Sequence, residues 1–158
     1  MNEKTILYII QGFIASGKTT YSTKLAKQNN AVHLNPDKIV EEMFEKEEYM
    51  KNWDKCFNSA LIKMWEVAKE NLLAGKSVVL DMGFWNRADR DIARAMAQKC
   101  CADFKHIYLY APDEILKKRI IETRSFEWAN LHIENFHKNK LRFEEPQEDE
   151  EYTKINNF

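Results

Sequence analysis

Apolar positions along the chain form short continuous runs that alternate with longer segments of helical spacing. The short runs predict strands at about 5–11, 31–35, 77–82 and 104–110. The longer segments predict helices near 17–28, 36–46, 54–74, 87–100 and 112–124. Strands that alternate with helices predict one α/β domain, in which right-handed crossovers build a parallel sheet covered on both faces.

The last part of the chain has a weaker pattern. A further helix is predicted near 128–142, and the acidic run over 144–151 is expected to be irregular. The acidic segment 144–158 could lack structure, dock on a basic helix end or belong to a partner site, and its composition does not select among these.

The octapeptide Gly12–Thr19 matches G-x-x-x-x-G-K-[ST] and directly follows the apolar run at 6–10. In this setting, backbone N–H groups and a helix N-terminus can hold phosphates. Lys18 would reach the β- and γ-phosphates, and the Thr19 hydroxyl would bind Mg²⁺. The predicted nucleotide-binding residues are Gly12, Ala15, Ser16, Gly17, Lys18, Thr19 and Thr20.

Two aspartates follow the second and third predicted strands, at the edge where an open α/β sheet binds its ligands. Asp37 could accept the proton of a substrate hydroxyl as a general base, or it could only offset a helix dipole. Asp81 could hold Mg²⁺ or contact the acceptor, or it could accept N–H groups of the next loop. Both aspartates are therefore candidates for substrate binding, and Asp81 is also a candidate metal ligand.

The segment after Asp81 mixes aromatic and polar residues. Phe84 and Trp85 could stack on a base or sugar, or they could be buried between helices. Asn86 is expected to cap the next helix. Arg87 is a candidate substrate contact, and Arg90 could likewise meet an anion.

A kinase needs cations that close over the transferred phosphate. Arg119 and Arg124 lie at a basic helix end followed by polar residues, so a lid is predicted over about 119–130, with both arginines as catalytic residues alongside Lys18 and Asp37. The alternative is that these cations only complement a helix C-terminus. The four histidines show no spacing typical of a metal site and are interpreted as structural.

Composition limits the classes of partner. The chain has 158 residues and a formal net charge of −1, which provides no overall field for attracting nucleic acid. It shows neither signal-peptide features nor an apolar stretch of membrane-spanning length, and its three cysteines lack metal-ligand spacing. These observations favour a cytoplasmic protein that does not enter a membrane; they do not identify protein partners.

Taken in order, these motifs resemble the phosphate-loop kinases grouped with polynucleotide 5′-hydroxyl kinases, zeta toxins and chloramphenicol phosphotransferases, the AAA_33-type kinases. The resemblance covers about residues 5–125 and implies a three-layer P-loop NTPase fold, nucleoside-kinase-like, with a helical lid. It also implies that Asp37 is the general base, that Asp81 lies in the acceptor site, and that Arg119 and Arg124 form the lid. Two positions depart from the pattern: Val40 stands where the phage-type enzyme has an arginine, and four residues instead of three separate the lid arginines.

The sequence therefore predicts a kinase that uses ATP and Mg²⁺ to phosphorylate a hydroxyl of a small molecule. A polynucleotide 5′-hydroxyl kinase is the nearest alternative, although a nucleic-acid acceptor would favour more basic contacts. A nucleotide-binding switch without an acceptor is the second alternative.

Overall fold

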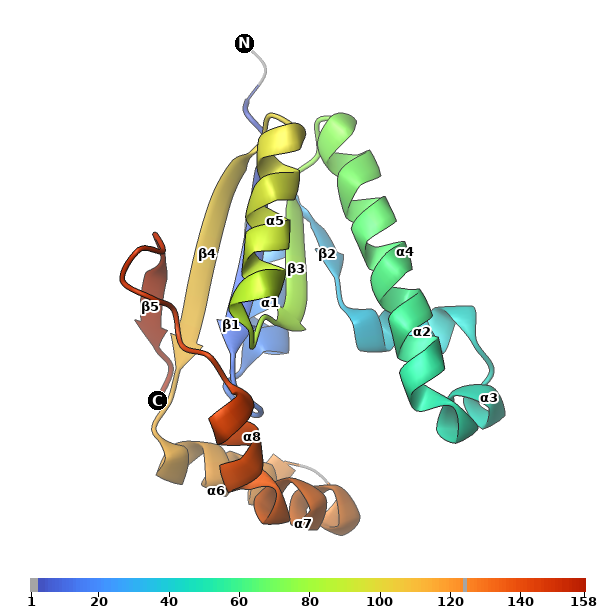
Figure 1. The fold of residues 1–158 in the computed structure, drawn as a ribbon, viewed down its shortest axis with the longest axis vertical. Helices are drawn as coiled ribbons and strands as arrows, with labels where there is room; N and C mark the ends of the chain where they lie inside the picture. Colours follow the sequence, from blue (N-terminus) through green and yellow to red (C-terminus); the bar gives the residue numbers. More distant parts are fainter. Residues whose placement is uncertain (1–2, 124) are drawn as a thin grey trace.

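A computed structural model describes residues 3–123 and 125–158 and shows a five-stranded sheet with helices on both faces (Figure 1). The sheet order is β2-β3-β1-β4-β5, and every neighbouring pair is parallel. The strands are β1 (Ile6–Gly12), β2 (Val32–Leu34), β3 (Val78–Gly83), β4 (Asp103–Tyr110) and β5 (Thr153–Asn156). The predicted parallel α/β sheet with helices on both faces is confirmed.

The helices connect successive strands and then cross the end of the sheet. They are α1 (Lys18–Gln28), α2 (Pro36–Met43), α3 (Lys46–Lys51), α4 (Trp53–Leu73), α5 (Arg87–Lys99), α6 (Asp113–Thr123), α7 (Phe126–Glu134) and α8 (Phe136–Arg142). No helix within the described residues is long and apolar enough to cross a membrane.

The alternation of side chains along β1 supplies both layers of the core. Leu7 and Ile9 pack with α4 and α5 on one face, whereas Tyr8 and Ile10 pack with α1 on the other. These four side chains are almost fully buried, which explains why the strand reads as a continuous apolar run instead of an alternating one.

Helices α6, α7 and α8 lie beyond the carboxyl ends of the strands, at the lower end of the molecule in Figure 1. They form a third apolar cluster with the start of the phosphate loop, in which Phe13 contacts Phe136 and Phe143 edge to face. The end of the sheet that carries the phosphate loop is therefore covered by its own small helical layer.

Helix boundaries differ from the predictions where the chain bends. The helix expected at 128–142 is two helices, because Asn135 interrupts the helical hydrogen bonding between α7 and α8. The helix expected at 36–46 ends at Met43, since Phe44 is extended, and the separate helix α3 precedes α4.

Strand β5 is absent from the predicted elements. Its sequence Thr-Lys-Ile-Asn contains one apolar residue, and its side chains are mostly exposed at the sheet edge. Pairing with Ile107–Tyr110 of β4 makes it a strand, so its conformation depends on a tertiary contact that its own pattern does not encode.

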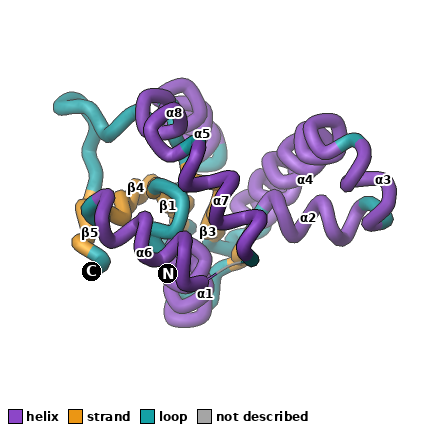
Figure 2. Tube along the Cα trace, turned by 90° about the horizontal axis from the view of Figure 1, so that it is seen from below, coloured by secondary structure: helices purple, strands orange, loops and turns teal. Residues whose placement is uncertain are grey.

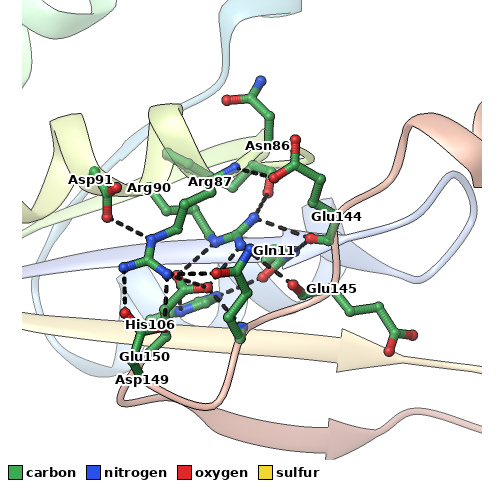
Figure 3. A network of polar contacts seen from close by, with 12 residues as sticks. Gln11, Asn86, Arg87, Arg90, Asp91, His106, Glu144, Glu145, Asp149 and Glu150 are labelled. Carbon is green, nitrogen blue, oxygen red and sulfur yellow. Dashed lines mark hydrogen bonds and ion pairs between the residues drawn. The ribbon is translucent and has the colours of Figure 1, made fainter.

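The acidic run is irregular, as predicted, but it is firmly attached to the sheet and to α5. Glu150 is buried and forms a two-point ion pair with the Arg90 guanidinium, with both N···O distances at 2.8 Å (Figure 3). Of the open alternatives, the structure therefore supports docking: Glu150 pairs with Arg90 of α5, and Asn157 near the end of the same segment accepts from Arg119 in the basic part of α6.

Candidate active site

The phosphate loop connects the carboxyl end of β1 to the first turn of α1. Ala15 and Gly17 have positive φ values of 62° and 93°, and the Ser16 N–H donates to the Phe13 carbonyl across the turn, at 3.1 Å. The Lys18 ammonium donates to the same carbonyl at 2.9 Å. The predicted octapeptide therefore forms a compact turn that leads directly into a helix N-terminus, an arrangement suited to binding anions.

Both glycines of the motif are required by close contacts. A Cβ at Gly12 would lie 2.3 Å from the buried Ser16 hydroxyl, and one at Gly17 would lie 2.5 Å from the Asn157 side-chain nitrogen. Gly17 also has a left-handed backbone, which other residues adopt only at a cost. Side chains at these positions would therefore deform the loop.

A cleft of about 620 Å³ opens beside the loop. Of the predicted nucleotide-binding residues, it is lined by Ala15, Gly17, Lys18, Thr19 and Thr20, whereas Ser16 is buried. The opposite wall includes Arg119 of α6 and Asn157, which follows β5. In Figure 2, seen from below, α6 lies across the end of the sheet that carries the phosphate loop, and α1 lies farther from the viewer.

Asp81 lies near the end of β3 and is 3% exposed. One of its carboxylate oxygens accepts hydrogen bonds from Asn35 at 3.1 Å and contacts the His33 Nε2 at 3.2 Å. Burial acts to raise the pKa of Asp81, but the contacts with His33 and Asn35 and the charge of Lys18 outweigh it, so the pKa lies below its usual value. An ionised carboxylate is thus held near the phosphate loop.

Asp37 lies in the first turn of α2, where it is exposed. The Asn35 side chain caps this helix by accepting from the Lys38 N–H, and the same side chain donates to Asp81. Asn35 therefore links the turn that carries Asp37 to the end of β3. The general-base role of Asp37 remains a prediction.

Arg119 projects from α6 toward the phosphate loop. Its guanidinium donates to the Ala15 carbonyl at 3.4 Å and to the Asn157 carbonyl. The predicted partner Arg124 lies outside the described residues. The predicted lid segment corresponds to the end of α6 and the first part of α7, with Ser125 capping α7 through the Trp128 N–H.

Arg87 and Arg90 both contact the acidic segment (Figure 3). Arg87 forms ion pairs with Asp149 at 2.8 Å and with Asp91 at 2.9 Å, so an acceptor could engage its guanidinium only by displacing these carboxylates. Arg90, a possible anion contact from the sequence, is fully buried, and the anion that it meets is the Glu150 carboxylate of the protein itself. Asn86 caps α5 through the Asp89 N–H, as predicted.

The two aromatic residues after β3 pack within the protein. Phe84 is 1% exposed, and Trp85 stacks on Phe13 with ring centroids 5.2 Å apart. The Trp85 indole N–H also donates to the Gly12 carbonyl. Of the two open alternatives, burial holds for Phe84, whereas Trp85 is only partly buried. Through its contacts with Phe13 and Gly12, Trp85 supports the start of the phosphate loop.

Few of the described side chains at the site could coordinate a divalent cation. No group of three or more His, Cys, Asp or Glu side chains that could hold a metal occurs within residues 3–123 and 125–158. A P-loop site needs few protein ligands, because Mg²⁺ is bound mainly by phosphate oxygens, water, one hydroxyl and a carboxylate. The exposed Thr19 hydroxyl and the ionised Asp81 carboxylate fit that requirement.

Comparison with known proteins agrees with this geometry. The AAA_33 family model, an AAA domain, matches residues 7–146. The chain belongs to this family. No curated protein sequence matches it significantly.

Solved structures show the same fold as this AAA_33 domain. A candidate kinase from Chloroflexus aurantiacus has a TM-score of 0.69 and 19% identity, with 98% of this chain and 86% of that chain covered. A gluconokinase from Sinorhizobium meliloti has a TM-score of 0.62 and 16% identity, covering 99% and 83%. Kti12 from Chaetomium thermophilum, in complex with ADP-AlF3, has a TM-score of 0.67 and 17% identity, covering 95% and 88%. The predicted P-loop NTPase fold and the assignment to the AAA_33 type are confirmed.

Three residues of the AAA_33 domain site were not predicted from the sequence: His33, Asn35 and Asn157. His33 and Asn35 are two positions apart in the β2 segment, which places them on the same side of the chain, facing Asp81. The two-residue spacing of His33 and Asn35 could therefore have identified them as site residues from the sequence. No comparable pattern identifies Asn157, because its place beside the loop depends on the position of β5.

Proposed function

We propose that the protein is a kinase that uses ATP and Mg²⁺ to phosphorylate a hydroxyl group of a small-molecule acceptor. The observation that carries the proposal is a phosphate loop at the same end of the sheet as the ionised Asp81 of β3 and the first turn of α2, which carries Asp37. Membership of the AAA_33 family supports a nucleotide-binding enzyme, and similarity in fold to a gluconokinase and a sugar kinase is consistent with a hydroxylated acceptor.

In this proposal each residue has one task. The loop N–H groups and Lys18 would neutralise the phosphates. Thr19 and Asp81 would hold Mg²⁺, which when bound would balance the charge that develops on the transferred group. Asp37 accepts the proton of the acceptor hydroxyl as its oxygen attacks the γ-phosphorus, and ADP leaves. Arg119, together with Arg124 as predicted, stabilises the phosphoryl oxygens.

A small acceptor is favoured over a nucleic-acid end. The position at which phage-type polynucleotide kinases carry an arginine is Val40, which is fully buried in the core and can make no contact with an acceptor phosphate. The net charge of −1 also provides little general attraction for a polyanion.

The test is to incubate the protein with γ-labelled ATP and Mg²⁺ and with separate pools of sugars, nucleosides and 5′-hydroxyl oligonucleotides. Label on a compound of the first two pools is the expected result. Label only on oligonucleotides would select the polynucleotide alternative. Slow hydrolysis that no pool stimulates would favour a nucleotide-dependent switch.

A further inference from the structure

Asn157 joins three parts of the molecule beside the phosphate loop. Its backbone N–H donates to the Tyr110 carbonyl at the end of β4, at 2.8 Å. Its side-chain amide donates to the Ser16 carbonyl at 2.8 Å, and its own carbonyl accepts from the Arg119 guanidinium. One residue thus contacts the loop, the sheet and the lid helix.

The side-chain contact determines the orientation of one peptide of the loop. In a trans peptide the C=O and the N–H lie in one plane and point in opposite directions. Because Asn157 holds the Ser16 carbonyl on its own side, the Gly17 N–H points away from Asn157. Backbone N–H groups of a phosphate loop are the groups that contact the phosphates.

The loop needs such a support from outside. Ala15 and Gly17 both have left-handed backbones, and the turn between them is closed by the hydrogen bond from the Ser16 N–H to the Phe13 carbonyl. The peptide that joins Ser16 to Gly17 lies outside that hydrogen bond. The buried Ser16 hydroxyl has no hydrogen-bond partner within the described residues, and it therefore does not hold the turn. The Asn157 amide supplies a direct restraint on this part of the loop.

The contact with Arg119 acts on the opposite wall of the cleft. One guanidinium nitrogen donates to the Ala15 carbonyl and another to the Asn157 carbonyl. The cation is thereby held over the loop before any phosphate is bound, which lowers the conformational cost of engaging one.

We propose that Asn157 is a positioning residue of the nucleotide site, whose side-chain amide orients the Gly17 N–H through Ser16. Its main-chain carbonyl, which substitutions at this position leave in place, contacts Arg119. Asn157 lies beyond the span that matches the family model, which ends at residue 146. The inference rests on the proposed function only in requiring that the loop binds a nucleoside diphosphate or triphosphate, and it does not depend on the acceptor.

The experiment measures ADP binding in the presence of Mg²⁺ by titration calorimetry for the wild type, Asn157→Ala and Asn157→Leu. Asn156→Ala is the matched control, because it removes the same side chain from an exposed position one residue earlier. We expect the Kd to rise at least tenfold for both Asn157 variants and to stay within twofold for the control. In ¹⁵N-labelled protein without nucleotide, the Gly17 amide resonance should move in the Asn157 variants and not in the control.

Two results would overturn the inference while leaving the proposed function intact. One is wild-type affinity in Asn157→Ala, and the other is an equal loss in Asn157→Ala and Asn156→Ala, which would mean that Asn157 only stabilises the strand edge. If Asn157→Ala unfolds, Asn157→Leu carries the comparison, because leucine has a similar size, has no hydrogen-bond donor and adds no charge beside the phosphates. Failure of the wild type to bind ADP would overturn both proposals.

Discussion

The charge and proton-accepting capacity of Asp37 can be tested by one conservative substitution. Asp37→Asn should lower kcat by about 10²- to 10⁴-fold, the usual contribution of a general base, with little change in the KM for ATP. Folding stability should change by only about 0.3–1 kcal/mol, because the side chain is an exposed residue in a helix first turn. Initial rates with labelled ATP and urea unfolding measure the two effects.

Asp54→Asn is the control for that substitution. Asp54 also lies exposed in the first turn of a helix, α4, so the variant removes the same charge from the same kind of position. It should leave kcat unchanged. Substantial transfer by Asp37→Asn would show that another group accepts the proton.

Gly17 is required by backbone conformation and by space. Gly17→Ala should reduce nucleotide affinity by at least 100-fold, because a Cβ at φ 93° would lie 2.5 Å from the Asn157 nitrogen and push the loop aside. ADP titration measures this loss. Gly75→Ala separates the two causes, since Gly75 has a φ of 80° but no atom within 4 Å of the added Cβ. That variant should lose about 1 kcal/mol of stability and keep its affinity for ADP.

Equal affinities in the two alanine variants would contradict this account of the loop.

The charge state of Asp81, also at the scale of single residues, depends on contacts from outside the phosphate-loop motif. Its ionisation depends on His33 and Asn35, residues that come from another strand and that the sequence motif does not include.

At the scale of elements, the buried ion pair between Arg90 and Glu150 attaches the acidic segment to α5. Arg90→Met should destabilise the fold by about 3–5 kcal/mol, because it leaves the Glu150 carboxylate buried without its cation. The double variant Arg90→Met with Glu150→Met should recover much of that loss. Chemical denaturation of the three proteins measures the difference.

Lys4→Met is the matched control for a cation removed from an ion pair, since Lys4 pairs with Asp103 on the exposed surface. It should cost less than about 1 kcal/mol. A similarly small effect for Arg90→Met would mean that the acidic segment detaches easily from the domain.

Helix and strand boundaries show which elements depend on local signals. Strands β1, β3 and β4 and helices α1, α4 and α5 were predicted to within a few residues, because burial on both faces of the sheet or on one face of the helix imposes a clear apolar pattern. The break between α7 and α8 and the strand β5 were missed. The break between α7 and α8 lies at Asn135, which ends one helix and begins the next, and the conformation of β5 depends on pairing with β4.

At the scale of the whole molecule, His106 should couple folding stability to pH. It lies at 3% exposure in the centre of the polar network, with its Nε2 2.7 Å from the Gln11 Oε1. Burial lowers the pKa of His106 from 6.5 to about 4, although the nearby Glu150 carboxylate opposes this. The unfolded chain therefore takes up this proton at a higher pH than the folded protein does.

Because the unfolded state binds this proton at a higher pH than the folded state, acidification favours unfolding. Between pH 7 and pH 5 the unfolded state binds the additional proton, so the free energy of unfolding should fall by about 2 kcal/mol as the solution is acidified. The low pKa of Glu150, about 2, adds a further loss only as the pH falls from about 4.5 toward 2. Urea unfolding at pH 7, 6 and 5 measures the first change separately from the second.

His106→Gln should flatten this dependence, because glutamine keeps polar atoms at the site and takes up no proton. His137→Gln, which changes an exposed histidine, should retain the wild-type slope. An unchanged slope in His106→Gln would show that other groups control stability in this pH range.

The sequence by itself determined the phosphate loop, the parallel α/β layers and the candidate roles of Lys18, Asp37 and Asp81. These follow from local chemistry: a phosphate loop is one continuous segment, and the strands of a buried parallel sheet must be apolar along their length. Tertiary structure decided the rest of the site, namely the contacts of His33 and Asn35 with Asp81, the burial of Arg90, and the place of Asn157 beside Ser16 and Arg119. The physical reason is that each of these contacts joins residues distant in the chain, and only the packed sheet brings their atoms within hydrogen-bonding distance.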